Sequence, residues 1–241
     1  MVRVIKMEEM LVREKLYVNN IPAIVWGEPS QKVYIYVHGK MSYKESAEQF
    51  AELAMKKGYQ TISFDLPEHG ERHDENYPCD VWNGCNDLNQ ILDYAQGRWE
   101  NISLYACSIG AHFALYAYQD KKLDYCMFQS PILDINQLIH RMFRWFHLSE
   151  EALRERKVIK TPFHVMTWDY YTYILEHPIE RWETPTNILY GTRDEMQTRE
   201  SVEEFASKYG CELVVAENSF HGFAKERDLP VAYEWMETYI K

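Results

Sequence analysis

The sequence contains no long apolar run. None of its segments approaches the roughly 20 consecutive apolar residues that a helix needs to cross a bilayer. Its opening segment, MVRVIKMEEMLVREK, is dense in charge and lacks the apolar core of a secretory signal peptide. We therefore expect a cytoplasmic protein with no stable membrane insertion.

The sequence also has fewer basic than acidic residues. Lys and Arg together number 26 against 37 Asp and Glu, so the formal net charge is -11. No basic run is present to gather a phosphate backbone, so nucleic acid is not an expected partner. The same acidity disfavours strongly anionic small molecules, unless the charge inside a pocket overrides the charge of the whole chain.

Cysteines are few and odd in number: Cys79, Cys85, Cys107, Cys126 and Cys211. An odd count in a chain with no export signal argues against a disulfide framework. Cys79 and Cys85 are separated by five residues, whereas common zinc pairs are separated by two to four. The loop 68–75 is rich in carboxylates and histidines, and we interpret it as a solvated surface rather than a metal site. We expect no metal and no cofactor.

Segments typical of strands alternate with segments typical of helices. The expected strands cover residues 15–18, 21–26, 33–37, 61–64, 102–106, 123–129, 186–190 and 212–216. The expected helices cover residues 46–57, 81–96, 109–118, 201–209 and 229–240, the first with Ser46 as its N-cap. This alternation predicts an α/β fold with a mostly parallel sheet and helices on both faces.

One stretch, residues 131–185, breaks the alternation. It is far longer than an ordinary connection, which indicates a functional insertion with its own helices. Apolar residues within 136–147 recur at helical spacing and form a wide stripe, and a second aromatic cluster follows at 168–173. We interpret residues 131–185 as a helical lid over a pocket and residues 1–130 with 186–241 as the core.

A candidate nucleophile lies in the turn Ala106-Cys107-Ser108-Ile109-Gly110. This turn follows an expected strand and precedes an expected helix, and it has small residues two positions before and after the serine. A sharp turn of this kind presents the hydroxyl clear of the backbone, and the N-terminus of the helix favours developing negative charge. The alternative is a structural serine in a tight turn. The Cys107 side chain should face away from the pocket and pack in the core.

Candidate partners for the serine follow two later strands. Asp194 lies after the glycine turn that ends the strand 186–190, with Glu195 as a competing carboxylate. His221 lies beyond the last strand, and an imidazole can take and return a proton near neutral pH. Turn aspartates and solvated loop histidines are the structural alternatives.

Two backbone N–H groups are candidates for binding an oxyanion. The turn His38-Gly39-Lys40 ends an apolar strand, so the Lys40 N–H can face the pocket. The Ile109 N–H, directly after the serine, would be the second donor. We interpret His38 as a structural residue beneath the site, or as a pocket residue, rather than as a catalytic group.

Together these motifs resemble those of the α/β-hydrolase superfamily, in particular its lidded serine esterases and lipases related to monoacylglycerol lipases and feruloyl esterases. The resemblance rests on the His38-Gly39 turn, the loop 65–70, the Ser108 elbow, the turn 191–194 and His221, in the family's order. It implies an eight-stranded sheet with a lid inserted after the sixth strand. Ala106 departs from the glycine that is usual in the elbow, and a serine nucleophile excludes the dehalogenase and epoxide hydrolase branches.

The expected function is hydrolysis of a small-molecule carboxylic ester through an acyl-enzyme on Ser108, with His221 as general base and Asp194 orienting it. His38, Met142, Trp145, Trp168 and Tyr171 are the candidate pocket residues. The alternatives are a thioesterase, peptidase or acyltransferase with the same triad, a non-catalytic ligand-binding protein, and a lipase acting at membrane surfaces. The oligomeric state is left open.

Overall fold

The computed structural model describes residues 11–162 and 164–241. Most of the opening segment 1–15, on which the expectation about a signal peptide rests, lies outside the described residues. Within the described ranges, no helix combines the length and the apolar character needed to span a membrane.

The β-branched and aromatic runs of the sequence form one central sheet of eight strands, as expected. Their order across the sheet is β1-β2-β4-β3-β5-β6-β9-β10. Strand β2 is antiparallel to both of its neighbours, and all the other neighbouring strands are parallel. The strands are β1 (Arg13–Val18), β2 (Ile21–Trp26), β3 (Lys32–Val37), β4 (Gln60–Phe64), β5 (Asn101–Cys107), β6 (Cys126–Gln129), β9 (Thr186–Arg193) and β10 (Glu212–Phe220).

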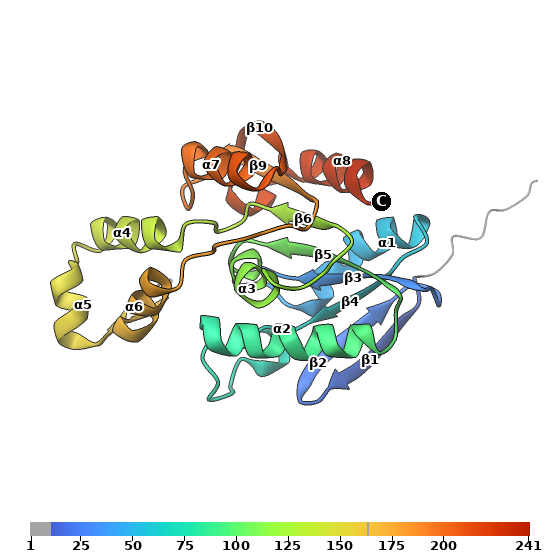
Figure 1. The fold of residues 1–241 in the computed structure, drawn as a ribbon, viewed down its shortest axis with the longest axis horizontal. Helices are drawn as coiled ribbons and strands as arrows, with labels where there is room; N and C mark the ends of the chain where they lie inside the picture. The colour runs from blue at the N-terminus through green and yellow to red at the C-terminus, as the bar shows by residue number, and fades with distance from the viewer. Residues whose placement is uncertain (1–10, 163) are drawn as a thin grey trace, which may run out of the picture.

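Helices cover both faces of this sheet (Figure 1). One face packs against α2 (Val81–Gln96), α3 (Ile109–Tyr118) and α7 (Arg199–Tyr209), and the other packs against α1 (Glu48–Lys56) and α8 (Leu229–Tyr239). Three short 3₁₀ turns complete the core: η1 (Lys44–Ala47), η2 (Gly70–Arg72) and η3 (His221–Phe223). The layers are those of the predicted α/β fold.

Strand β3 shows why the chain needs both helical layers. Side chains alternate between the faces of a strand. Val33, Ile35 and Val37 belong to the apolar cluster on the α2–α3 face, whereas Tyr34 and Tyr36 belong to the cluster on the α1–α8 face. A strand that is apolar on both sides has to be covered on both sides, so β3 lies in the interior of the sheet.

Residues 131–185 connect β6 to β9 and contain three helices and a small hairpin. The elements are α4 (Ile135–Trp145), α5 (Glu150–Arg156), β7 (Val158–Lys160), β8 (Val165–Thr167) and α6 (Trp168–Glu176). Figure 1 shows α4, α5 and α6 grouped together beyond one end of the sheet. Buried side chains of this segment, among them Leu138, Leu153 and Tyr170, belong to the same apolar cluster as the α2–α3 face.

Most expected elements agree with the structure to within a few residues, and several details differ. Strand β9 continues through Gly191 to Arg193, where a glycine turn was expected, and β10 continues to Phe220 rather than ending at Ala216. The first long helix does not use Ser46 as its N-cap, because the chain enters it through the turn η1 and the Ser46 hydroxyl donates to the Tyr43 carbonyl instead. Strand β6 begins at Cys126 rather than at residue 123. The antiparallel hairpin β7–β8 was not expected at all.

Gly191 sets how closely β9 and β10 can approach. A Cβ atom on Gly191 would lie 2.5 Å from the carbonyl oxygen of Ser219. We expect Gly191→Ala to lower the free energy of unfolding by about 2 kcal/mol, because two backbones would have to move apart. Urea unfolding measures this change. Gly97→Ala is the matched control, because its nearest contact would be 3.6 Å, and an equal loss in both variants would contradict the packing argument.

Candidate active site

Ser108 occupies a strained turn between β5 and α3. Its backbone angles are φ 52° and ψ −119°, a region that L-residues rarely adopt and that costs of order 1–3 kcal/mol. Gly110 makes this turn possible, because a Cβ there would lie 2.5 Å from the His38 carbonyl oxygen. Ala106, fully buried at the end of β5, supplies the small residue on the other side. The serine is therefore held at the tip of the turn.

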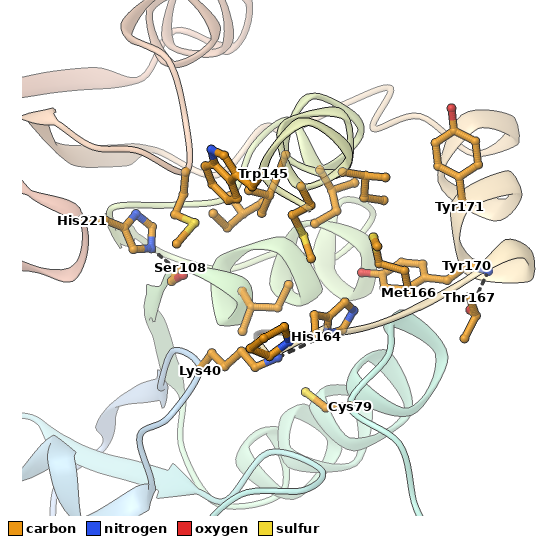
Figure 2. A pocket seen from close by; sticks show the side chains of 18 of the residues that line it. Lys40, Cys79, Ser108, Trp145, His164, Met166, Thr167, Tyr170, Tyr171 and His221 are labelled. Carbon is orange, nitrogen blue, oxygen red and sulfur yellow. Dashed lines mark hydrogen bonds between the residues drawn. The ribbon is translucent and has the colours of Figure 1, made fainter. Parts of the chain in front are cut away.

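Ser108, His221 and Asp194 lie in one hydrogen-bonded chain. The Ser108 hydroxyl oxygen is 2.8 Å from Nε2 of His221 (Figure 2). Nδ1 of the same imidazole is 2.8 Å from Oδ2 of Asp194. An imidazole that donates from Nδ1 to a carboxylate leaves Nε2 free to accept the serine proton. Ser108 lies between β5 and α3, Asp194 lies in the loop after β9, and His221 begins the turn η3 after β10, so the fold brings together three distant segments.

One oxygen of the Asp194 carboxylate is held by backbone N–H groups of its own loop. Its Oδ1 atom accepts the backbone N–H groups of Met196 at 2.7 Å and Gln197 at 3.0 Å, and its side chain is fully buried. These donors fix the carboxylate with Oδ2 facing His221. The competing Glu195 side chain is exposed, and its residue contributes only a carbonyl oxygen that accepts from Arg141. Asp194 is thus the carboxylate that contacts the imidazole.

The histidine loop is anchored to the end of β6, which the sequence did not indicate. Gln129 donates from Nε2 to the Gly222 carbonyl oxygen at 3.0 Å, and the Gly222 N–H donates to the Ser130 hydroxyl at 3.2 Å. Tyr105 in turn donates its hydroxyl to Oε1 of Gln129 at 2.7 Å. No motif marks Gln129 or Ser130, because their role depends on β5, β6 and β10 ending at the same edge of the sheet.

A second buried amide joins the acid loop to the start of residues 131–185. Oε1 of Gln197 accepts the N–H groups of Leu133 at 3.0 Å and Asp134 at 2.8 Å. Its Nε2 donates to the carbonyl oxygens of Asp134 and Met196. Gln197 is completely buried. The segment that carries α4 therefore begins at a point fixed to the Asp194 loop.

The two residues whose backbone groups are expected to bind an oxyanion both line the cavity beside Ser108. Lys40 and Ile109 line that cavity, and a Cβ on Gly39 would lie 3.2 Å from the Cβ of Ser108, so the two turns approach closely. Neither the Lys40 N–H nor the Ile109 N–H donates to a backbone carbonyl in the described part of the chain. Each of these N–H groups can therefore donate to a ligand oxygen.

His38 lies beneath the site and does not line the cavity, which corrects its assignment as a pocket residue. It is 1% exposed, Nδ1 bonds the Gly39 carbonyl oxygen at 2.7 Å, and Nε2 accepts the Leu66 N–H at 3.1 Å. Burial lowers the pKa of His38 to about 4, so the ring is neutral. His38 holds the loop after β4 against the turn after β3. Cys107 packs on the α1–α8 face, as expected, and burial raises its pKa to about 12.

A cavity of about 470 Å³ opens beside Ser108 and His221 (Figure 2). Three of the expected pocket residues line it: Met142, Trp145 and Tyr171. Trp168 does not, because its ring packs 5.7 Å from the Tyr171 ring and lies under the Lys157 ammonium. The other apolar lining residues come mainly from residues 131–185, among them Ile135, Leu138, Ile139, Leu153 and Met166.

One corner of the cavity is polar. Nζ of Lys40 lies 3.3 Å from Nδ1 of His164, which belongs to the turn between β7 and β8. Burial and the nearby Lys40 charge lower the pKa of His164 to about 4, and burial also lowers the pKa of Lys40. Cys79 lines the same region, and burial raises its pKa to about 12. The sequence singled out only the backbone of Lys40 and gave no signal for His164.

The loop 68–75 contributes structural contacts. Glu68 accepts the backbone N–H of Cys79, and Nδ1 of His69 bonds the Pro67 carbonyl oxygen. Within the described ranges, no three His, Cys, Asp or Glu side chains are grouped as a metal ion requires.

Solved structures similar to this chain share its fold. No protein-family model and no curated protein sequence matches it. The esterase Est1E from Butyrivibrio proteoclasticus, solved with ferulic acid bound, is 17% identical at a TM-score of 0.75 and covers 94% of this chain and 97% of its own. A putative hydrolase from Agrobacterium vitis S4 is 16% identical at a TM-score of 0.75, covering 96% and 99%. Mouse alpha/beta hydrolase domain-containing protein 10 is 15% identical at a TM-score of 0.73, covering 95% and 98%. The chain has the α/β-hydrolase fold.

The strain at Ser108 predicts an unusual stability difference. Glycine adopts a positive φ without a Cβ penalty, whereas alanine retains the strain and loses the hydroxyl. We expect Ser108→Gly to be more stable than Ser108→Ala by about 1 kcal/mol, measured by urea unfolding of both variants. At a position with ordinary helical or extended backbone angles, the alanine variant would be the more stable of the two. A Ser108→Ala protein more stable than Ser108→Gly would therefore contradict the strained geometry.

Proposed function

We propose that this chain is a serine hydrolase that cleaves carboxylic esters, with Ser108 as nucleophile, His221 as general base and Asp194 as the acid that orients it. The observation that carries the proposal is the hydrogen-bonded chain Ser108–His221–Asp194, whose two links are each 2.8 Å long and which opens onto an apolar cavity. The strained turn at Ser108 and the fold shared with esterases support it.

The proposed reaction has two steps. As the Ser108 oxygen attacks the ester carbonyl, its proton passes to Nε2 of His221, and the new oxyanion is held by the N–H groups of Lys40 and Ile109. Nε2 then returns the proton to the departing alcohol. Water attacks the acyl-enzyme with His221 again as base, and the acid leaves. Asp194 keeps the Nδ1 proton and stabilises the imidazolium throughout.

We also propose that residues 131–185 act as a lid and that the rest of the chain is the core. The lid supplies most of the apolar wall opposite Ser108, so it excludes water and contacts the acyl or alcohol part of the substrate. The ferulic acid bound to Est1E supports a substrate with an apolar or aromatic group of moderate size. The site as proposed uses no cofactor, and we place the protein in the cytoplasm.

Ser108→Ala is expected to reduce kcat for a p-nitrophenyl ester by roughly three to six powers of ten, because no other group can form the acyl-enzyme. Ser103→Ala is the matched control, since Ser103 is a buried serine on β5 and is not among the residues that line the cavity. Near-normal turnover by Ser108→Ala would overturn the assignment. A wild-type chain that turns over no ester in a panel of acyl lengths would favour the non-catalytic alternative.

The lid wall is expected to set acyl length. Met142 is on α4, is 5% exposed and lines the cavity. Met142→Trp should fill part of the cavity and lower kcat/KM for p-nitrophenyl hexanoate by about tenfold relative to p-nitrophenyl acetate. Val158→Trp is the control, because Val158 is exposed and lies outside the lining. Equal losses on both esters in Met142→Trp would show that the acyl chain lies elsewhere.

A further inference from the structure

The cavity beside Ser108 has two chemically different sides. Apolar side chains of α4, such as Leu138 and Met142, form one wall. The Lys40 ammonium and the His164 imidazole meet at another, 3.3 Å apart (Figure 2). Lys40 belongs to the turn after β3, and His164 to the turn between β7 and β8, so the polar corner forms where the core meets residues 131–185.

The Lys40 charge has no counter-ion at this corner. No Asp or Glu is among the residues that line the cavity, and no described carboxylate forms an ion pair with Lys40. Glu68 attracts Lys40 through space, but its carboxylate accepts the backbone N–H of Cys79. Because its pKa is near 4, His164 is neutral and adds no charge of its own. Lys40 is exposed, and the one side-chain partner of its ammonium at this corner is neutral, so its charge is available to pair with an anionic ligand in the cavity.

The donors at the corner have the right chemistry for a carboxylate. The Lys40 ammonium carries three N–H donors, of which His164 takes one at its Nδ1 atom. A neutral imidazole that accepts at Nδ1 carries its proton on Nε2, so His164 offers a second donor. A carboxylate accepts several hydrogen bonds at once, and charge-assisted bonds are about twice as strong as neutral ones.

We propose that Lys40 and His164 form a subsite for a carboxylate on the substrate, so that the chain prefers esters carrying a free acid group a few bonds from the ester carbonyl. The identity of the substrate as an ester rests on the proposed function, whereas the affinity for the carboxylate does not. The local charge at this corner overrides the net charge of -11, which by itself disfavours anionic ligands.

Lys40 would then act at both ends of the substrate. In the proposed function its backbone N–H holds the oxyanion, and its side chain reaches His164. The length of the Lys40 side chain therefore sets the distance between the scissile carbonyl and the acid group of the substrate. This favours flexible dicarboxylic monoesters over esters whose acid group is adjacent to the carbonyl.

Calorimetry on the Ser108→Ala protein tests the subsite without any turnover. The ligands are the mono-benzylamide of adipic acid, which keeps a free carboxylate, and the same compound with that carboxylate replaced by a primary amide. We expect the acid to bind about tenfold more tightly than the amide. Adding Lys40→Met should bring the ratio close to one, and Lys40→Arg should keep most of it.

Lys122→Met is the matched control for the loss of one positive charge. Lys122 is exposed in the loop before β6, at the opposite end of the sheet from the cavity, and its removal should leave the acid-to-amide ratio unchanged. An acid that binds no more tightly than the amide, or a ratio that survives Lys40→Met, would overturn the proposal.

A kinetic comparison separates the subsite from the proposed function. The two substrates are mono-4-nitrophenyl adipate, which has a free acid group, and methyl 4-nitrophenyl adipate, in which that acid group is methylated. On the wild-type protein, kcat/KM for release of 4-nitrophenol should be about tenfold higher for the free acid, and Lys40→Met should remove the difference. If neither ester is hydrolysed while the calorimetric preference for the acid holds, the proposed ester hydrolysis fails and the carboxylate subsite stands. If both esters are hydrolysed at equal rates and the two calorimetric ligands bind equally, the subsite fails and the hydrolase assignment stands.

Discussion

The hydrogen bond between the Ser108 hydroxyl and the His221 imidazole joins residues 113 positions apart. It can form only because β5, β9 and β10 are parallel members of one sheet and end at the same edge. A shift of one residue in any of these strands would turn the side chain to the other face of the sheet or move the loop away. The close approach of Gly110 to the end of β3 and of Gly191 to the Ser219 carbonyl holds these ends in place.

Two buried amides extend this constraint beyond Ser108, His221 and Asp194. Gln129 ties the histidine loop to β6, and Gln197 ties the acid loop to the start of residues 131–185. Their hydrogen bonds satisfy backbone groups that would otherwise be buried without partners, so they stabilise the fold and the site together. The start of the segment that carries α4 is therefore held in a fixed position relative to Asp194.

Much of this arrangement could be predicted from the sequence because its signals are local. Helix α2 spans the expected residues, since Asp80 caps its N-terminus and the chain turns at Gly97. The chain turns sharply at Ser108, and this turn both exposes the serine hydroxyl and starts helix α3 at the next residue.

The parts that could not be predicted depend on contacts between distant segments. Strands β7 and β8 have three residues each and show no periodicity, so only their pairing defines them. Trp168 belongs to the same aromatic cluster as Tyr170 and Tyr171, which line the cavity, but its own ring packs under the Lys157 ammonium instead. The contact between His164 and Lys40 spans 124 positions and has no local signal.

In the proposed function, His221 activates one hydroxyl, that of Ser108. Labelling with a fluorophosphonate probe, followed by intact-mass measurement and peptide mapping, tests it most directly, because such probes react only with a serine made nucleophilic by its surroundings. We expect a single adduct on the peptide that contains Ser108, and its loss when His221 is replaced by alanine. A chain that takes up no probe, or that carries the adduct on another residue, would rule out Ser108 as the activated serine.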